Sequence, residues 1–338
     1  MIIDVSTRIW SDGSEIGLHP GMVPARMKER WPAIDASADA HDAATSCVDL
    51  AFIVGFQSEF LKAHLPAEAV ASFVGQAPHR RIGFAGIDPM HREAILDIDR
   101  AVTLGLSGIS ISPAAQNFHP TNSRAMRVYE YCERLGLPVL IEQGIQLSLP
   151  AVPLEYARPA SLDEVARTFP NLKMVLGSFG YPWIDETLLL IGKHANLFTN
   201  TAGVIERPWT LYNALTRAFE AGVLDKVLLA SGFPFESPEQ SIKRIYSVNT
   251  YSVGTELPSI PRSQLRAIVE HDALDCLGLQ RPEGASISRG IGRDFDSDLS
   301  LADASEVNQG DSEATDDEWL VDESFKSSSF DHPRRPAQ

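Results

Sequence analysis

Eight short apolar runs, each followed by a segment with the spacing of an amphipathic helix, constrain the fold of this chain most strongly. The runs are rich in Val, Ile and Leu. Such runs are typical of parallel strands that are buried on both faces. The runs are residues 2–8, 49–56, 81–88, 107–113, 137–144, 172–178, 195–201 and 226–232.

Eight strands that alternate with helices over about 250 residues predict an α/β fold, a (β/α)8 TIM barrel with its functional residues at the C-terminal strand ends. The clearest predicted helices are residues 91–104 and 122–135, together with a final helix over 262–279 that ends at Gly278. A doubly wound open sheet is the alternative. It is disfavoured because no G-x-G-x-x-G loop follows an early strand.

The composition changes at residue 283. From there to the end of the chain Ser, Asp, Glu and Gly prevail, and the segment carries −9 of the total net charge of −16. Its few aliphatic residues bury too little surface to offset the entropy of the chain. We therefore expect two parts, a TIM-barrel domain at 1–282 and a disordered acidic tail at 283–338.

Within the tail, the segment "DDEWLVDESF" sets apolar side chains among acids, as short docking peptides often do. Trp319, Leu320 and Phe325 are the candidate contacts with a protein partner. A solvated tail that aids solubility is the alternative.

Several classes of protein are disfavoured by composition. No apolar run approaches the roughly 20 residues that cross a bilayer, and no basic segment precedes an apolar one at the N-terminus, so we expect a cytoplasmic protein. Neither part of the chain has the basic stripe that nucleic acid or an anionic membrane requires. Three distant cysteines argue against a disulfide framework and against a thiolate metal site.

The first run, "IIDVSTRIW", ends in polar residues. Strict alternation along a strand places Asp4, Ser6 and Arg8 on one face, which we predict to be the inward face. A strand with a polar triplet at its inward end is suited to form one wall of a site. Serine and arginine, however, are poor metal ligands.

Five segments together carry a resemblance that covers roughly residues 1–280: "IIDVSTRIW", "GISISPAAQNFHP", "LGLPVLIEQG", "NLKMVLGSFGYPW" and "KVLLASGFPFESP". Their order and spacing resemble the amidohydrolase-related metal-dependent hydrolases, the branch that includes aminocarboxymuconate-semialdehyde decarboxylase-like proteins. The resemblance implies a (β/α)8 barrel that binds a divalent metal, usually zinc, and hydrolyses or decarboxylates small molecules. It also implies that dimers are common, although no motif here fixes an oligomeric state.

The metal ligands that the resemblance implies are replaced in this sequence. The family's first strand ends in His-x-His, and the matching residues here are Ser6 and Arg8. Histidines of the fifth and sixth strands match Glu142 and Ser178, and the aspartate of the eighth strand matches Gly232. In the fourth strand, where members often read Gly-Ile-Lys-Leu-His-Pro, this chain has "GISISP".

A catalytic zinc needs about three N, O or S ligands and an open position. Of the matched positions only Glu142 offers one, since Ser110 and Ser112 in the fourth strand supply weak neutral hydroxyls. A permanent guanidinium charge at Arg8 repels a dication. The sequence therefore predicts no metal and no other cofactor.

Charge suggests what takes the place of the metal. Arg8 puts a fixed positive charge at the vacated position, with Glu142 and Asp4 as negative partners, so an internal ion pair is the simplest outcome. Alternatively, Arg8 grips a carboxylate or a phosphate in a bidentate manner while Glu142 acts as a general base, with Ser6, Ser110, Ser112 and Ser178 lining the site.

Two further residues are candidates for the same site. His119, in "NFHP", follows the fourth strand and is a tentative catalytic group, with a turn-capping role as the alternative. Trp10 follows the first strand, as Trp183 follows the sixth, where each is suited either to line a pocket for a flat ligand or to pack among loops.

Three functions fit these observations. The first, which we favour, is a catalytically degenerate barrel that binds a small molecule or acts as a scaffold. The second is a metal-independent hydrolase, lactonase or decarboxylase of a small carboxylate, using Arg8, Glu142 and His119. A conventional zinc hydrolase, the third, demands ligands that the sequence lacks.

Overall fold

The computed structural model of the chain describes residues 1–19 and 28–285, and each of the eight apolar runs contributes one strand to a single parallel sheet. The order of the strands around the sheet is their order along the chain. They are β1 (Ile3–Thr7), β2 (Leu50–Val54), β5 (Arg81–Gly86), β6 (Gly108–Ile111), β7 (Val139–Ile141), β8 (Met174–Leu176), β9 (Leu197–Asn200) and β10 (Val227–Leu228).

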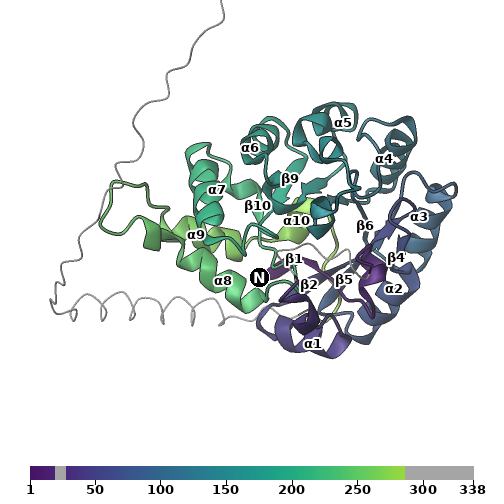
Figure 1. The fold of residues 1–338 in the computed structure, drawn as a ribbon, viewed down its shortest axis with the longest axis horizontal. Helices are drawn as coiled ribbons and strands as arrows, with labels where there is room; N and C mark the ends of the chain where they lie inside the picture. Colours follow the sequence, from purple (N-terminus) through teal and green to yellow (C-terminus); the bar gives the residue numbers. More distant parts are fainter. Residues whose placement is uncertain (20–27, 286–338) are drawn as a thin grey trace, which may run out of the picture. The chain divides into compact units, whose positions relative to one another are not determined.

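The first and last strands meet, so that the sheet curls into a nearly closed barrel (Figure 1). The Val5 N–H donates to Leu229 O and the Gly232 N–H donates to Ser6 O, both at 3.0 Å. Helices lie around the outside of the strands. The predicted TIM barrel is confirmed.

The helices between the strands are amphipathic and cover the outer face of the barrel. In α4 the buried residues Ala125, Val128, Tyr129 and Cys132 recur at helical spacing, and Asn122 caps the first turn. These helices are α1 (Ala38–Ala44), α2 (Ala67–Gln76), α3 (Ala94–Thr103), α4 (Ser123–Leu135), α5 (Leu162–Thr168), α6 (Ile184–Lys193), α7 (Pro208–Glu220) and α8 (Pro238–Tyr246).

Two apolar cores result, one inside the barrel and one between the strands and the helices. Ile3 and Val5 of β1 belong to the inner core, whereas Ala51 of β2 belongs to the outer one. Leu274 and Leu277 also pack into the inner core. The short helix α10 (Ala273–Leu277) thus closes the N-terminal end of the barrel.

The predicted single helix over 262–279 is wrong, because the structure has two helices there. The first, α9 (Arg262–Val269), stops before Glu270, and α10 begins afresh at Ala273. The Asp272 carboxylate accepts the Leu274 N–H, which caps a new helix and ends the old one. The predicted end at Gly278 is confirmed, since this glycine has φ 69° and terminates α10.

The predicted alternation along β1 is also wrong, because Asp4 does not share a face with Ser6 and Arg8. The register of β1 against β2 shifts between Asp4 and Thr7. Before the shift Asp4 lies opposite Ala51, in the outer layer, and beyond it Ser6 and Arg8 reach the inside. An irregularity of this kind changes which residues share a face.

Loops at the C-terminal strand ends build a third apolar cluster that sequence reasoning did not predict. A two-stranded hairpin, β3 (Gln57–Ser58) with β4 (Ala63–His64), contributes Ala63 to it. Trp10 lies in the same cluster, where it stacks on Trp31 with ring centroids 6.5 Å apart.

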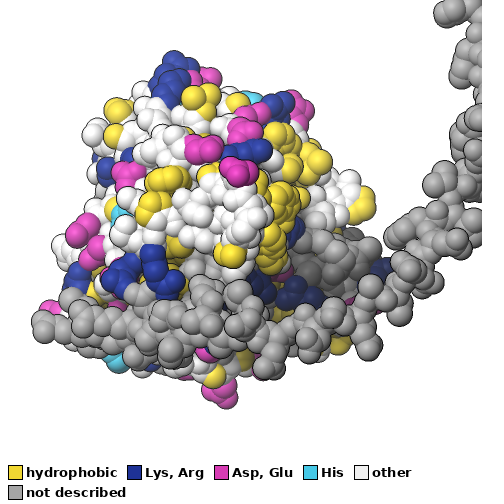
Figure 2. Space-filling model, turned by 90° about the vertical axis from the view of Figure 1, so that its left-hand side faces the viewer, with side chains coloured by type: hydrophobic (Ala, Val, Ile, Leu, Met, Phe, Trp, Pro, Cys, Tyr) yellow, Lys and Arg dark blue, Asp and Glu magenta, His cyan; other side chains and the backbone are white. Residues whose placement is uncertain are grey.

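The surface charges of the barrel are mixed in sign. On the face shown in Figure 2, acidic and basic side chains lie among one another and among apolar ones. Within residues 1–19 and 28–285, no helix has the length and apolar character of a membrane span.

Candidate functional site

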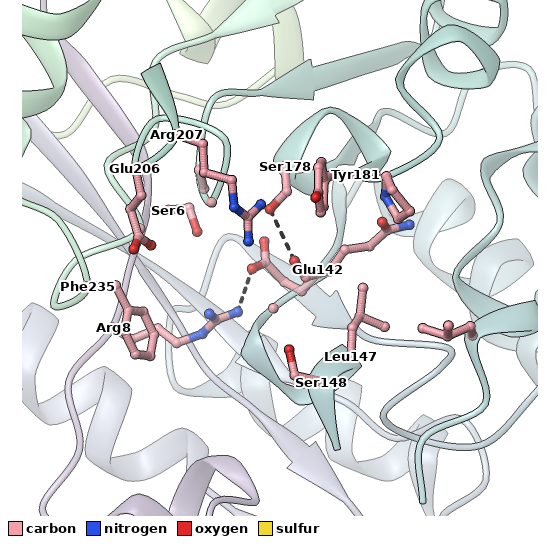
Figure 3. A pocket seen from close by; sticks show the side chains of 17 residues that line it. Ser6, Arg8, Glu142, Leu147, Ser148, Ser178, Tyr181, Glu206, Arg207 and Phe235 are labelled. Carbon is pink, nitrogen blue, oxygen red and sulfur yellow. Dashed lines mark hydrogen bonds and ion pairs between the residues drawn. The ribbon is translucent and has the colours of Figure 1, made fainter. Parts of the chain in front are cut away.

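A cavity of about 210 Å³ opens at the C-terminal ends of the strands (Figure 3). Five strands and the loops after them supply its wall: β1 and β7 through β10. Polar and charged side chains line it beside apolar ones such as Leu147 and Phe235. In a (β/α)8 barrel this is the face on which ligands bind.

An ion pair crosses the cavity. The Arg8 Nη2 donates to Glu142 Oε2 at 2.5 Å, and the two residues are only 9% and 7% exposed. The structure thus contains the internal ion pair that the sequence suggested. The contact uses one atom of each group, and among the described residues Arg8 Nε and Glu142 Oε1 have no hydrogen-bond partner.

The serine hydroxyls of the predicted site bind backbone carbonyls. Ser112 Oγ donates to Glu142 O at 2.9 Å, and Ser178 Oγ donates to Gln143 O at 3.1 Å. Ser110 Oγ donates to Gly55 O at 2.6 Å. Ser178 and Ser6 line the cavity, whereas Ser110 and Ser112 lie buried beneath its wall.

The backbone after β8 adopts an unusual conformation at the cavity wall. Ser178 and Phe179 have φ of 57° and 52°, in the left-handed region that non-glycine residues rarely occupy. Asn200 Oδ1 holds the turn by accepting the Ser178 N–H at 2.9 Å. A Cβ on Gly203 would lie 2.9 Å from Ser178 Oγ, so only glycine leaves room there. Such strain often accompanies functional sites.

A second arginine, which sequence reasoning missed, faces the same cavity. Arg207 lies just before α7, with its guanidinium carbon 4.3 Å from the centroid of the Tyr181 ring. The neighbouring Glu206 pairs with Arg30 at 3.0 Å. Arg207 follows β9 by seven residues, so a search confined to strand ends could not find it; a polar residue in the β9–α7 loop was the available signal.

Asp4 does not line the cavity, although we expected it to. Its carboxyl group is buried and accepts N–H groups from Ser6 at 3.2 Å and from Ser231 at 3.0 Å. Burial raises the pKa of Asp4 to about 6. Asp4 therefore ties the ends of β1 and β10 together from behind the wall.

His119 and Trp10 also lie outside the cavity wall. His119 is exposed, and its Nδ1 contacts Thr121 Oγ1 at 2.9 Å and accepts the Thr121 N–H, which is the turn-capping arrangement. Trp10 is buried, and its ring packs against that of Phe235 in the cavity wall, with centroids 5.8 Å apart. The expected pocket roles of these two residues are not what the structure shows.

The described part of the cavity wall offers few metal ligands. In the part of the chain that the structure describes, no group of three or more His, Cys, Asp or Glu side chains is placed to hold an ion. The acidic residues of the wall are Glu142 and Glu206, each paired with an arginine.

Solved structures share this fold at low sequence identity. An uncharacterized TIM-barrel protein, Bb4693, from Bordetella bronchiseptica is 20% identical with TM-score 0.63, over 82% of this chain and 99% of that one. A probable 2-pyrone-4,6-dicarboxylic acid hydrolase from Acinetobacter baumannii, with citric acid bound, is 14% identical with TM-score 0.58, over 82% and 99%. A dihydroxybenzoic acid decarboxylase from Polaromonas sp. JS666, with manganese and 2-nitroresorcinol bound, is 18% identical with TM-score 0.58, over 85% and 99%.

No curated protein matches the sequence. A family model does: the model described as "Amidohydrolase" matches residues 3–279, which is nearly the whole described barrel. Apart from Ile2, the five segments that carried the resemblance lie in this range. The chain belongs to the amidohydrolase family.

Proposed function

We propose that this chain is a catalytically degenerate member of the amidohydrolase family whose barrel binds a small carboxylate without a metal. The Arg8–Glu142 ion pair carries the proposal, because it fills the position at which the family resemblance puts the metal. The guanidinium and the carboxylate compensate each other's charge there.

The residues present do not fit a divalent metal. Metal binding would have to take Glu142 from Arg8 and leave a buried guanidinium charge uncompensated beside the ion. The remaining matched residues, Ser6, Ser178 and Gly232, offer hydroxyls or no side-chain donor. We therefore derive no chemical step through a metal.

Metal content and ligand binding test the proposal together. The purified protein is analysed by elemental mass spectrometry, and its thermal unfolding is followed with zinc, manganese or a chelator added. We expect substoichiometric metal and an unchanged melting temperature, and a rise in melting temperature with small carboxylates such as benzoate. Stoichiometric metal whose removal lowers the melting temperature would overturn the loss of the metal site. Failure of every small carboxylate to bind would overturn the ligand class.

A metal-independent hydrolase, lactonase or decarboxylase is the second candidate, favoured by the strained Ser178–Phe179 turn at the cavity wall. In that case Glu142 is the base and Arg8 the electrostatic partner. Glu142→Gln would abolish turnover of a substrate found by screening lactones and carboxylates. Under the degenerate reading, the screen yields no turnover that Glu142→Gln removes.

The predicted partner site in the tail, with Trp319, Leu320 and Phe325, lies outside the described residues. It stays a prediction from composition, as do the disordered tail and the cytoplasmic location.

A further inference from the structure

We propose that Arg207, and not Arg8, is the anion anchor of the cavity, and that the cavity selects a ligand with a single negative charge. The inference rests on the proposed carboxylate-binding function and assigns its recognition to particular residues. Sequence reasoning gave the anchoring role to Arg8.

Arg8 is already engaged. It is 9% exposed, and its guanidinium contacts Glu142 across the barrel. A ligand carboxylate that took the place of Glu142 would leave that carboxylate buried and without a countercharge, which is costly. The ion pair therefore presents the ligand with no net charge.

Arg207 is in a different state. It is partly exposed on the cavity wall, and no carboxylate of the described residues forms an ion pair with it. Its guanidinium lies over the ring of Tyr181, which fixes the side chain. The N–H donors of a guanidinium point outward in its own plane, so packing against a ring leaves them available to a planar carboxylate. Figure 3 shows the guanidinium directed toward the centre of the cavity.

The charges on the wall determine how many anionic groups fit. Arg8 with Glu142 is neutral, and Glu206 is neutralised by Arg30. Of the described residues that line the cavity, Arg207 is left as the uncompensated charge. One carboxylate neutralises it, and a second would have to break one of the two ion pairs.

The size of the cavity limits the ligand further. Its volume is about 210 Å³. Leu147 and Phe235 provide apolar contact. A compact monocarboxylate with an apolar body suits both the volume and the wall.

The experiment compares three probes of similar shape and different charge: benzoate, neutral benzamide and dianionic isophthalate. Their dissociation constants are measured by isothermal titration calorimetry with the wild-type chain and with Arg207→Gln. We expect benzoate to bind the wild type, and Arg207→Gln to weaken it by on the order of tenfold to a hundredfold, as the loss of a charge-assisted contact does. Arg207→Lys, which keeps the charge but not the planar fork, should lie between the two.

Matched controls keep the result interpretable. Arg217→Gln removes an arginine of α7, the helix that Arg207 precedes. Arg217 pairs with Asp185 outside the cavity, so the change should leave benzoate affinity unchanged. The melting temperatures of all variants show whether each is folded. Benzamide should bind weakly and lose nothing in Arg207→Gln, and isophthalate should bind no tighter than benzoate.

The outcomes separate the two proposals. Equal benzoate affinity for folded Arg207→Gln and for the wild type would overturn the role of Arg207 while the carboxylate function stands. Isophthalate binding at least tenfold tighter than benzoate would overturn the selection for one charge. If the wild type binds neither benzoate nor isophthalate, it is the proposed function that fails.

Discussion

At the scale of single residues, the cavity is governed by how each charge is compensated. Arg8 and Glu142 are both more than nine-tenths buried. Their ion pair as a whole therefore adds little to the free energy of unfolding, whereas removing one partner lowers that free energy strongly. Within residues 1–19 and 28–285, no carboxylate pairs with Arg207, which packs against the Tyr181 ring. Of these two arginines of the cavity wall, Arg8 is thus held in an ion pair, and Arg207 is available to a ligand carboxylate.

Splitting the buried pair should be costly, and replacing it whole should not. We expect Arg8→Met or Glu142→Leu alone to lower the free energy of unfolding by about 3–5 kcal/mol, because each leaves a buried charge alone. The double variant should recover most of that loss. Urea unfolding of the four proteins gives the coupling energy. Single variants that lose less than about 1 kcal/mol would show that the pair is not buried in solution.

The buried carboxyl group of Asp4 should make the free energy of unfolding depend on pH. Its folded-state pKa of about 6 lies above the ordinary value of 3.8, so the native protein holds this proton more tightly than the unfolded chain. The contribution of Asp4 to the free energy of unfolding therefore falls as pH rises from about 4 to about 6, by on the order of 3 kcal/mol, and stays low above that.

Asp4→Asn removes this titration, so the stability of the wild type relative to the variant should fall over the same pH range. Urea unfolding between pH 4 and pH 8 measures the difference. Asp12→Asn, at an exposed carboxylate, is the control. Its stability relative to Asp4→Asn should fall with pH as that of the wild type does. A difference between wild type and Asp4→Asn that is constant with pH would contradict the burial of Asp4.

At the scale of elements, the sequence predicts what depends on repeated patterns. The apolar runs locate the eight strands of the barrel, and the helical spacing locates α3 and α4. The shift in β1 and the break before α10 leave no such pattern, because each depends on one or two residues in a tertiary context. The site was predictable where it coincides with strand ends, as at Arg8 and Glu142, and not where a loop returns over the cavity, as at Arg207.

The turn after β8 permits a matched test of crowding. Gly203 and Gly222 both have positive φ, at 69° and 68°, but only Gly203 has a close neighbour, Ser178 Oγ. Gly222→Ala should cost about 1 kcal/mol for the left-handed backbone alone. Gly203→Ala should cost at least about 1 kcal/mol more, from the added overlap. Equal losses in urea unfolding would mean that the turn shifts freely.

At the scale of the whole molecule, the barrel is closed at one end by a helix from the end of the described chain. Leu274 and Leu277 of α10 share one apolar core with β1 and the other strands. The first and last elements of the domain are thereby held in one interior. Barrel and closing helix should unfold together.

Leu274→Ala tests this coupling. The side chain is 1% exposed in the inner core, so its truncation should cost about 2–5 kcal/mol and lower the unfolding midpoint seen by circular dichroism and by tryptophan fluorescence alike. Leu189→Ala, at a leucine that is 73% exposed, is the control and should change stability by less than about 0.5 kcal/mol. Separate transitions for the two probes would show that α10 is not part of the cooperative unit.

The Arg8–Glu142 pair also bears on how such a protein can change over time. Its members come from the first and fifth strands around the barrel, on opposite sides of the mouth. A substitution at either position alone leaves the other residue as an isolated buried charge, which is costly. We therefore expect the two positions to change together, as a pair, wherever they change at all.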